Sequence, residues 1–430
     1  MAKNSQVESA GLNAIPIEER KSWPGVAFIW AGSCCCVPAL MVGAGITMGL
    51  PFGLAALAMI IGYSVSVIMM ILMSILSADR GLPAVVAISS SFGKAGASKL
   101  VSLIIAFCYT CWFGFQAVVC GEAFASILQG IGVPIPSMLS TIIWGMIMCI
   151  TAVYGYSWIE KLNVIAVPAL ILILVYAMIV VFGDPESIVK ITNHTPTTQM
   201  SMIAAVGTSI GGFASGAVLS GDVTRYCKSR KDVVISSIVG VIPVGVGTML
   251  VGSILAIHSG AVGMDTGSIV TMLSSVGSPI LGMLVLVLAT WTTNVCNAYS
   301  AGFALLSLTG AHDNKRAWFT LGAGIIGTLL AVIGITNYFN SFLNILAVFI
   351  PPIVGVVAVD YFVIKKGNPA AWAEKPGFNW AGVIAWIVGS AIALLLPKLL
   401  IPTLNAIVIA CILYLILYPI FYRGNRTGVE

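Results

Sequence analysis

Charged residues are scarce in this sequence: Asp, Glu, Lys and Arg make up only 8% of its 430 residues, whereas 59% are hydrophobic. Soluble domains carry about 25% charged residues, so the composition excludes a soluble fold. Apolar stretches of about 20 residues can cross the hydrocarbon of a bilayer as helices, and they are too long for the strands of a membrane barrel. We therefore predict an all-α integral membrane protein.

Histidine is scarce too, and this limits the chemistry available. The chain has three His, none at the centre of an apolar run, and no acid sits clearly at the middle of one. A proton relay of imidazoles or carboxylates therefore has little support. Spacing brings no nucleophile, base and third group together, so we expect no enzyme activity, no catalytic residue and no organic cofactor.

The ten cysteines lie mostly inside apolar runs, and three follow one another at Cys34, Cys35 and Cys36. Successive side chains on a helix diverge by about 100°, so this triplet cannot converge on one metal ion. We interpret the cysteines as small apolar fillers.

Long apolar runs are abundant in the chain. Hydropathy predicts twelve membrane spans, at residues 24–48, 52–78, 100–128, 137–156, 162–183, 200–220, 233–257, 278–308, 318–336, 341–363, 379–397 and 402–422. Residues 1–22 are polar and lack a short apolar core with a cleavage site, so we expect a tail and no signal peptide. Residues 423–430 form a second short tail.

The basic residues predict the orientation of the chain. Of the 20 Lys and Arg, all but Lys190 and Lys398 fall on the side of the N-terminus, which leaves 18 on that side. Because loops rich in Lys and Arg stay in the cytoplasm, we predict two cytoplasmic tails and expect a bacterial inner membrane. The net charge of +5 then reflects orientation and contact with anionic lipid, and it indicates neither nucleic acid nor an obligate protein partner.

Two spans carry sequences that weaken a helix. Span 1 contains Gly32 to Pro38 and two further Gly, and span 6 contains four Gly from Gly207 to Gly216. Matching breaks in the two halves of a membrane protein point to the binding site of a transporter, because unwound backbone is tolerated only in protein or beside a watery cavity. The alternative is that the Gly residues serve helix packing and that Pro38 only kinks span 1.

The five-span separation of these two sequences favours a binding site and predicts an inverted repeat. The first repeat covers residues 23–183 (spans 1–5), the second covers residues 200–363 (spans 6–10), and residues 378–422 add spans 11 and 12. Repeats with an odd number of spans run in opposite directions across the membrane. Their broken helices place free carbonyls near the midplane, where these can bind a cation or a polar solute.

Span 3 carries a polar and aromatic face near its middle. Tyr109, Trp112 and Gln116 lie at positions i, i+3 and i+7, so they share one side of a helix. An indole that stacks and a carboxamide that offers one acceptor and two donors suit a flat heteroaromatic solute. The alternative is that both side chains join helices by packing and hydrogen bonding.

Span 8 offers oxygen atoms of the kind that bind Na⁺. Ala289, Thr292 and Thr293 share a face at i, i+3 and i+4, so one carbonyl and two hydroxyls form half a shell, which carbonyls of span 1 complete. The alternative is that each Thr hydroxyl bonds its own i−4 carbonyl. Asn294 and Asn297 face the cavity or another helix, because an unpaired carboxamide in lipid is costly.

Together these segments resemble the nucleobase:cation symporter family, which includes cytosine permeases, hydantoin transporters and other purine and pyrimidine carriers. The resemblance covers essentially the whole chain. Its most specific stretches are Trp112-Phe113-Gly114, Gly211-Gly212-Phe213 with Asp222 to Tyr226, Trp291-Thr292-Thr293-Asn294, and Gly81-Leu82-Pro83 with Ser91 to Lys94. The family resemblance implies the five-plus-five inverted-repeat fold, alternating access, and a solute held between Trp112 and Phe213.

The resemblance also implies the residues of two sites. The substrate-binding residues would be Tyr109, Trp112, Gln116, Gly212, Phe213, Ser215 and Asn294. The Na⁺ ligands would be the carbonyls of Gly32, Cys36 and Ala289 and the hydroxyls of Thr292 and Thr293.

Some positions depart from the cytosine permeases. Tyr109 replaces a Gln and Gly212 replaces a Ser, whereas Gln116 resembles the hydantoin-type carriers. Because these positions would touch the ring edges, we expect a substrate other than cytosine. The sequence thus predicts a Na⁺ symporter for a nucleobase or a related planar nitrogen heterocycle. A proton-coupled carrier of the same fold is the alternative; a channel would need a continuous polar pore, whereas the polar groups cluster at one depth.

Overall fold

The structure is a computed structural model that describes residues 12–260, 272, 275, 279–338, 342, 345, 346, 348–395 and 401–422. Residues 1–11 of the expected N-terminal tail, the tail 423–430 and parts of spans 8, 10 and 11 lie outside the described residues. Among the described residues the structure contains helices and no strand; an isolated parallel bridge joins Lys21 and Cys227.

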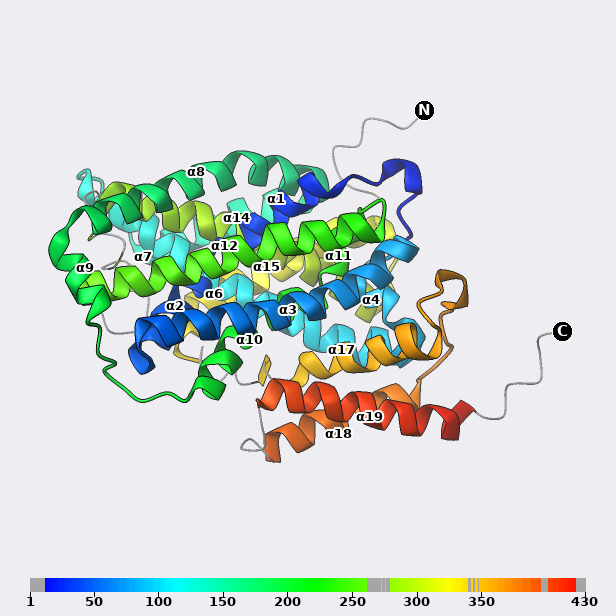
Figure 1. Cartoon of the computed structure of the whole chain (residues 1–430). Helices are drawn as coiled ribbons and strands as arrows, with labels where there is room; N and C mark the ends of the chain where they lie inside the picture. The colour runs from blue at the N-terminus through cyan, green and yellow to red at the C-terminus, as the bar shows by residue number, and fades with distance from the viewer. Residues whose placement is uncertain are drawn as a thin grey trace.

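The long helices follow the predicted apolar runs (Figure 1). Their bounds are α1 Trp23–Cys34, α2 Val37–Gly49, α3 Phe52–Arg80, α6 Ser102–Gly130, α7 Ser137–Val153, α8 Tyr156–Gly183, α10 Met202–Val218, α12 Arg230–Ser259, α14 Pro279–Thr309, α15 Arg316–Val332, α17 Pro351–Ala358, α18 Trp380–Leu395 and α19 Pro402–Tyr422. The short elements are η1 Ile17–Glu19, α4 Ala84–Ala87, α5 Ser89–Phe92, η2 Gly96–Val101, α9 Pro185–Thr192, α11 Gly221–Thr224, η3 Asp313–Lys315, η4 Ile335–Tyr338, η5 Val359–Ile364 and η6 Pro369–Ala371.

Several helices have the length and composition of membrane spans. In the described part of the chain, six helical segments are long and apolar enough to cross a bilayer, or seven if the bent pair α1 and α2 is one span. The segments α7, α17 with η5, and α18 are apolar but shorter. An all-helical fold is therefore confirmed for the described residues, whereas the number of twelve spans stays a prediction.

The first predicted break occurs between α1 and α2. The two helix axes differ by 54° across the residues Cys35 and Cys36. Pro38 lies in the first turn of α2, where its missing N–H needs no partner inside the helix. The sequence Gly32 to Pro38 therefore interrupts span 1 as expected.

The position predicted for the second break is wrong. α10 runs without interruption from Met202 through the Gly-rich stretch to Val218, and only Leu219 and Ser220 separate it from α11. Packing explains one of these glycines, Gly216. A Cβ at Gly216 would lie 2.8 Å from the ring of Phe213, so Gly leaves room for this side chain.

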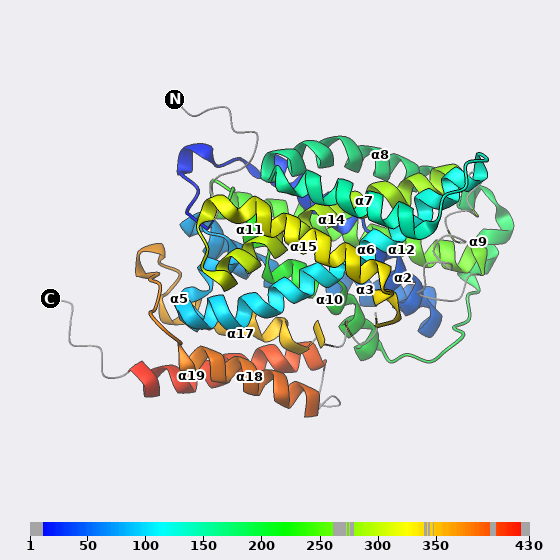
Figure 2. The same ribbon diagram turned by 180° about the vertical axis from the view of Figure 1, so that it is seen from behind.

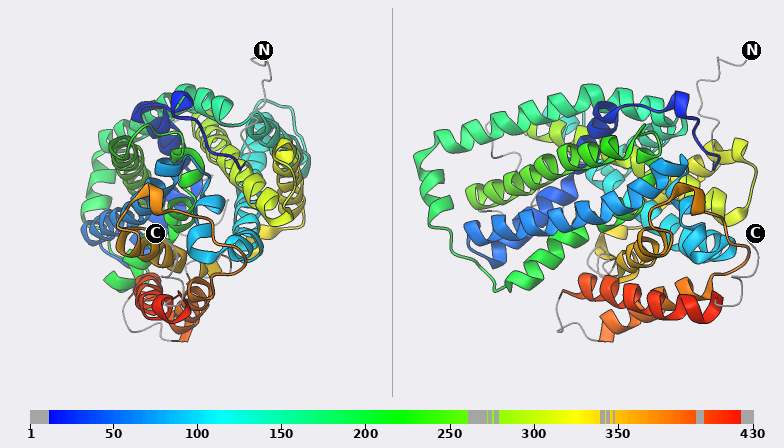
Figure 3. Two further views of the ribbon diagram at one scale, coloured as in Figure 1. Left: turned by 90° about the vertical axis from the view of Figure 1, so that its right-hand side faces the viewer. Right: turned by 45° about the vertical axis from the view of Figure 1, so that its right-hand side comes forward.

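The helices pack into two groups. The first helix group contains α1, α2, α3, α10 and α12, which contact one another, and the second helix group contains α6, α7, α14 and α15. α8 contacts both α1 and α14 and so connects the groups, while α17, α18 and α19 pack together along one side (Figure 2). The end-on view shows the helices as a bundle, with α18 and α19 at its margin (Figure 3).

Basic segments gather at one end of the molecule. The amide of Lys21 donates to the carbonyl of Tyr226 at 2.6 Å, and Arg20 donates to the carbonyl of Ala78 at 2.6 Å. The N-terminal segment, the α3–α4 turn and the loop before α18 therefore share an end, whereas α9, which carries Lys190, lies at the opposite end (Figure 1). This arrangement agrees with the charge asymmetry of the sequence.

Candidate functional site

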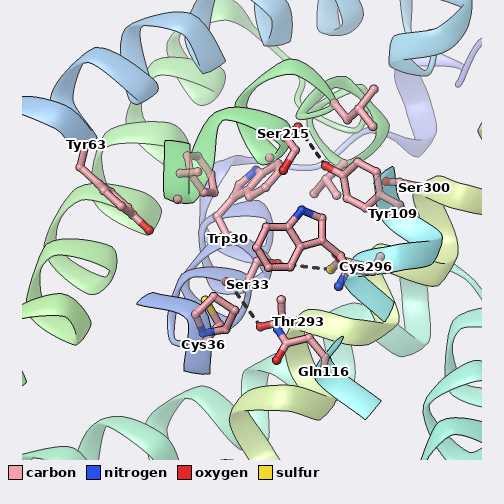
Figure 4. A pocket seen from close by; sticks show the side chains of 18 residues that line it. Trp30, Ser33, Cys36, Tyr63, Tyr109, Gln116, Ser215, Thr293, Cys296 and Ser300 are labelled. Atoms are coloured by element: carbon pink, nitrogen blue, oxygen red, sulfur yellow. Dashed lines mark hydrogen bonds between the residues drawn. The ribbon is translucent and has the colours of Figure 1, made fainter. Parts of the chain in front are cut away.

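A pocket lies between the two helix groups, beside the break of α1 and α2 (Figure 4). Its wall comes from α1, α2, α3, α6, α10 and α14, together with the turn after α10. It contains indole and phenyl rings, phenols, hydroxyls, carboxamides and two thiols, and none of the described residues that line it carries a charge. Such a wall suits a small, flat and uncharged solute.

The predicted face of α6 lines this pocket. Tyr109, Trp112 and Gln116 are all buried and all belong to the wall. The hydroxyl of Tyr109 donates to the carbonyl of Ser215 on α10 at 2.9 Å, so this side chain joins the two helix groups across the pocket. Gln116 is only 1% exposed, and no described residue hydrogen-bonds its Oε1. This buried acceptor is therefore available to a solute.

The aromatic residues of α10 and α6 enter the pocket from opposite groups. Phe213 stacks on Tyr63 with 5.6 Å between ring centroids and meets the edge of Trp30 at 6.0 Å. Trp112 packs edge-on against Phe342 at 5.2 Å. The neighbours of each ring thus hold it in place, and both rings line the same space. Two rings fixed in this way can take a planar solute between them.

The structure distinguishes the two Asn residues of α14. The Nδ2 of Asn294 donates to the carbonyl of Phe113 at 3.0 Å, and this side chain lies behind the wall. Asn297 lines the pocket instead, and its Nδ2 donates to the Oδ1 of Asn294 at 3.0 Å. Of these two carboxamides, that of Asn297 therefore borders the space a solute would occupy. Gly212 and Ser215, the other predicted residues of α10, both line the pocket.

The oxygens predicted for a cation come together next to the pocket. The hydroxyl of Thr292 lies 3.1 Å from the carbonyl oxygen of Gly32, and that of Thr293 lies 3.4 Å from the same oxygen. Both hydroxyls also approach the carbonyl of Ala289, at 3.1 and 2.9 Å. α1 ends two residues after Gly32, so the carbonyl of Gly32 has no helical amide partner among the described residues. These oxygens form one cluster that joins α1 to α14.

Two details of this cluster differ from the simplest expectation. The hydroxyls of Thr292 and Thr293 also reach their own i−4 carbonyls, as the alternative interpretation has it. The carbonyl of Cys36 accepts from the amides of Ala39 and Leu40 and so starts α2, while its side chain lines the pocket. Four of the five predicted oxygens thus lie in one cluster. The fifth, the carbonyl oxygen of Cys36, also accepts hydrogen bonds from the first turn of α2.

The sequence analysis missed several residues of the wall. Trp30 and Ser33 lie one turn apart on α1, Tyr63 comes from α3, and Cys296 and Ser300 come from α14. Ser33 lies three residues before Cys36, and Ser300 lies three residues after Asn297. Helical spacing from these predicted residues could therefore have identified both serines. From the sequence alone, Trp30 is interpreted as a membrane-interface anchor and Tyr63 as a packing residue. No sequence pattern therefore indicated that these two side chains line a pocket.

Some residues of the specific motifs lie outside the pocket. Asp222 and Arg225 are fully buried near the end of α11. Asp222 accepts a hydrogen bond from the amide of Ala84 at 2.9 Å, and Arg225 donates to the hydroxyl of Tyr299 at 3.3 Å. This part of the sequence therefore joins helices.

Known proteins of similar sequence are permeases. The sequence profile of the family described as "Permease for cytosine/purines, uracil, thiamine, allantoin" matches residues 14–417. The cytosine permease of Escherichia coli (strain K12) is 26% identical over 426 residues, which cover 99% of this chain and 98% of that protein. The hydantoin permease of Microbacterium maritypicum is 23% identical over 443 residues, which cover 91% and 88%.

Known structures of similar fold are transporters. Mhp1, a nucleobase-cation-symport-1 family transporter in a closed conformation with bromovinylhydantoin bound, has a TM-score of 0.85 at 21% identity and covers 99% of this chain and 98% of its own. A Na⁺-coupled sialic acid symporter has a TM-score of 0.69 at 16% identity, with 98% and 93% covered. The described helices therefore have the fold of Mhp1. The chain is an integral membrane transporter and no enzyme, and it belongs to the family of permeases for cytosine and purines, uracil, thiamine and allantoin.

Proposed function

We propose that this protein is a secondary transporter that couples Na⁺ to the movement of a nucleobase or a hydantoin-like planar nitrogen heterocycle by alternating access. The observation that carries the proposal is the uncharged pocket between Trp112 and Phe213. Its wall offers stacking surfaces and neutral hydrogen-bonding groups, which suit a neutral heteroaromatic ring and disfavour a carboxylate or an ammonium group.

In this proposal the solute lies between the two rings, and carboxamides contact its edges. Gln116 supplies the buried Oε1 acceptor and two N–H donors, and Asn297 supplies an acceptor that Asn294 orients. The hydroxyl of Tyr109 is engaged with Ser215, so it offers the ring only an acceptor. The cytosine permease and the hydantoin permease among its relatives, and Mhp1 with bromovinylhydantoin bound, support this class of substrate.

The oxygens of α1 and α14 fit a hard cation such as Na⁺. The carbonyls of Gly32 and Ala289 and the hydroxyls of Thr292 and Thr293 would hold it, with a further carbonyl from the turn at Cys36. A bound Na⁺ supplies a positive charge that ties α1 to α14. Because α1 and α14 also line the pocket, occupancy of the cation site would raise the affinity for the solute, and the reverse.

The proposal includes the topology. Twelve spans would form two inverted repeats, residues 23–183 and 200–363, followed by spans 11 and 12 at residues 378–422, with both tails in the cytoplasm of a bacterial cell. The fold of Mhp1 and the gathering of basic segments at one end support this arrangement. A proton-coupled carrier would need a carboxylate or an imidazole at the site, and no described residue that lines the pocket is Asp, Glu or His.

The test is thermal stabilisation of the purified protein in detergent. Pyrimidines, purines, hydantoins and amino acids are added in turn, each in NaCl and in choline chloride of equal ionic strength. A ligand that binds only the folded state raises the melting temperature with its occupancy. We expect a shift for one class of planar heterocycle, in NaCl only. The Thr293→Ala variant should need at least about tenfold more Na⁺, which corresponds to about 1.4 kcal/mol.

Thr309→Ala is the matched control, because Thr309 lies at the far end of the same helix and bonds its own i−4 carbonyl at 2.9 Å. Its Na⁺ dependence should equal that of the wild type. Equal shifts in choline and in Na⁺ would rule out Na⁺ coupling. Shifts for amino acids alone would rule out the substrate class.

A further inference from the structure

One buried polar group beside the cation cluster has no assigned task. Asn163 lies on α8, which contacts α1, and its side chain is fully buried. Its Nδ2 donates to the carbonyl of Ile159 at 2.8 Å, which fixes the carboxamide. No described residue donates to its Oδ1. Leaving a buried acceptor without a hydrogen-bond partner is destabilising, so this oxygen is available to a ligand that the described residues do not supply.

This oxygen lies directly against Gly32. A Cβ placed on Gly32 would lie only 1.6 Å from Oδ1 of Asn163 and 3.1 Å from a methyl group of Val167. Standard bond lengths around Gly32 then put Oδ1 within about 6 Å of the Gly32 carbonyl oxygen. The hydroxyls of Thr292 and Thr293 approach that same carbonyl. An unpartnered oxygen on α8 thus lies within about 6 Å of the carbonyl oxygen of α1 that the hydroxyls of α14 approach.

We propose that Asn163 is a further residue of the cation site, and that its Oδ1 faces the cation or a water molecule bound to it. The inference rests on the proposed Na⁺ coupling and extends it to a third helix. A neutral oxygen suits a hard cation and, unlike a carboxylate, adds no charge to the site. Gly32 is required because any side chain there would displace this oxygen.

The test is a titration of thermal stability with Na⁺, without solute, at constant ionic strength. Removing the oxygen in Asn163→Ala should raise the Na⁺ concentration at half-maximal shift at least about fivefold. Asn163→Asp keeps an oxygen and adds a negative charge, so it should lower that concentration at least about threefold. Asn405→Ala is the control, because Asn405 is also buried and also has a side-chain atom without a partner, but it lies on α19.

The readout is the Na⁺ midpoint, so a general loss of stability in a variant does not mimic the expected result. If Asn163→Ala does not fold, the Asp variant still decides. Midpoints within about twofold of the wild type in the variants would show that Asn163 only packs α8 against α1 and would overturn this inference alone. A wild-type protein that does not respond to Na⁺ would overturn both this inference and the proposed coupling.

Discussion

The indole of Trp112 is held edge-on by Phe342, so it presents a fixed surface to the pocket. Stacking of one base on an aromatic side chain contributes about 1–3 kcal/mol. We expect Trp112→Ala to weaken solute binding about 10- to 100-fold and Trp112→Phe to weaken it less, because a smaller ring still stacks. Calorimetric titration with the heterocycle identified by the ligand panel measures both variants.

Trp318→Ala is the control for that comparison, since Trp318 is 72% exposed at the start of α15. Its affinity should match the wild type. Normal affinity in Trp112→Ala, with an unchanged melting temperature, would contradict the stacking arrangement. A loss of affinity as large in Trp112→Phe as in Trp112→Ala would indicate that the N–H of the indole matters more than its face.

Helical spacing accounts for the pocket residues that the sequence could predict. Tyr109, Trp112 and Gln116 share a face in any regular helix, so their convergence needed no tertiary information. Asn294 and Asn297 are also one turn apart, but which of them reaches the pocket depends on the rotation of α14 against its neighbours. The role of Trp30 depends on tertiary packing, which places its ring 6.0 Å from that of Phe213.

At the scale of elements, glycine occurs both next to a helix break and inside a continuous helix, and composition does not distinguish the two cases. Gly32 precedes a real break of span 1, whereas Gly212 and Gly216 lie inside the continuous α10. Pro38 makes the difference, because a proline within the first turn favours a new helix start, while Gly alone only weakens a helix. In lipid the backbone of α10 must satisfy its own hydrogen bonds, so the glycines remain helical, and Gly216 provides room for Phe213.

Close packing of α2 and α12 also depends on glycine. A Cβ at Gly252 of α12 would lie 2.2 Å from the carbonyl oxygen of Leu40, a backbone atom that cannot move alone. We expect Gly252→Ala to lower the melting temperature by several degrees, since overpacking costs about 1–3 kcal/mol. Differential scanning fluorimetry in detergent measures the change.

Gly247→Ala on the same helix is the matched control, because no atom lies within 4 Å of a Cβ there. Alanine is the better helix former by about 1 kcal/mol, so this variant should equal or exceed the wild type in stability. Equal melting temperatures for the two alanine variants would mean that α2 and α12 are not in backbone contact.

At the scale of the whole molecule, charge and hydropathy predicted where the helices lie and which loops share an end. The contacts of Arg20 with Ala78 and of Lys21 with Tyr226 agree with that assignment. The division into two helix groups was beyond the sequence pattern. The division depends on which helix faces pack together. In a membrane protein the faces that contact lipid and the faces that contact other helices are both apolar, so hydropathy does not distinguish them.

The end that carries the N-terminal segment is fastened by a contact between distant elements. Lys21 forms an ion pair with Glu160 at the start of α8 and lies 5.0 Å above the ring of Tyr156. Tyr156 in turn stacks on Tyr226, just after α11, with 3.9 Å between centroids. The contact therefore links the N-terminal segment, α8 and the turn before α12. In the alternating-access cycle proposed above, this end would open to release the solute, so we expect the ion pair to hold it closed.

We expect Glu160→Gln to speed the reaction of the pocket thiols Cys36 and Cys296 with a membrane-impermeant thiol reagent about two- to fivefold. An exposed ion pair contributes about 0.2–1 kcal/mol, which sets this range. The increase should occur only in vesicles that expose the Lys21 end. Lys190→Ala, which breaks an ion pair with Glu186 on α9 at the opposite end, is the control. Faster labelling from the α9 side, or none at all, would mean that Lys21 and Glu160 do not close this end.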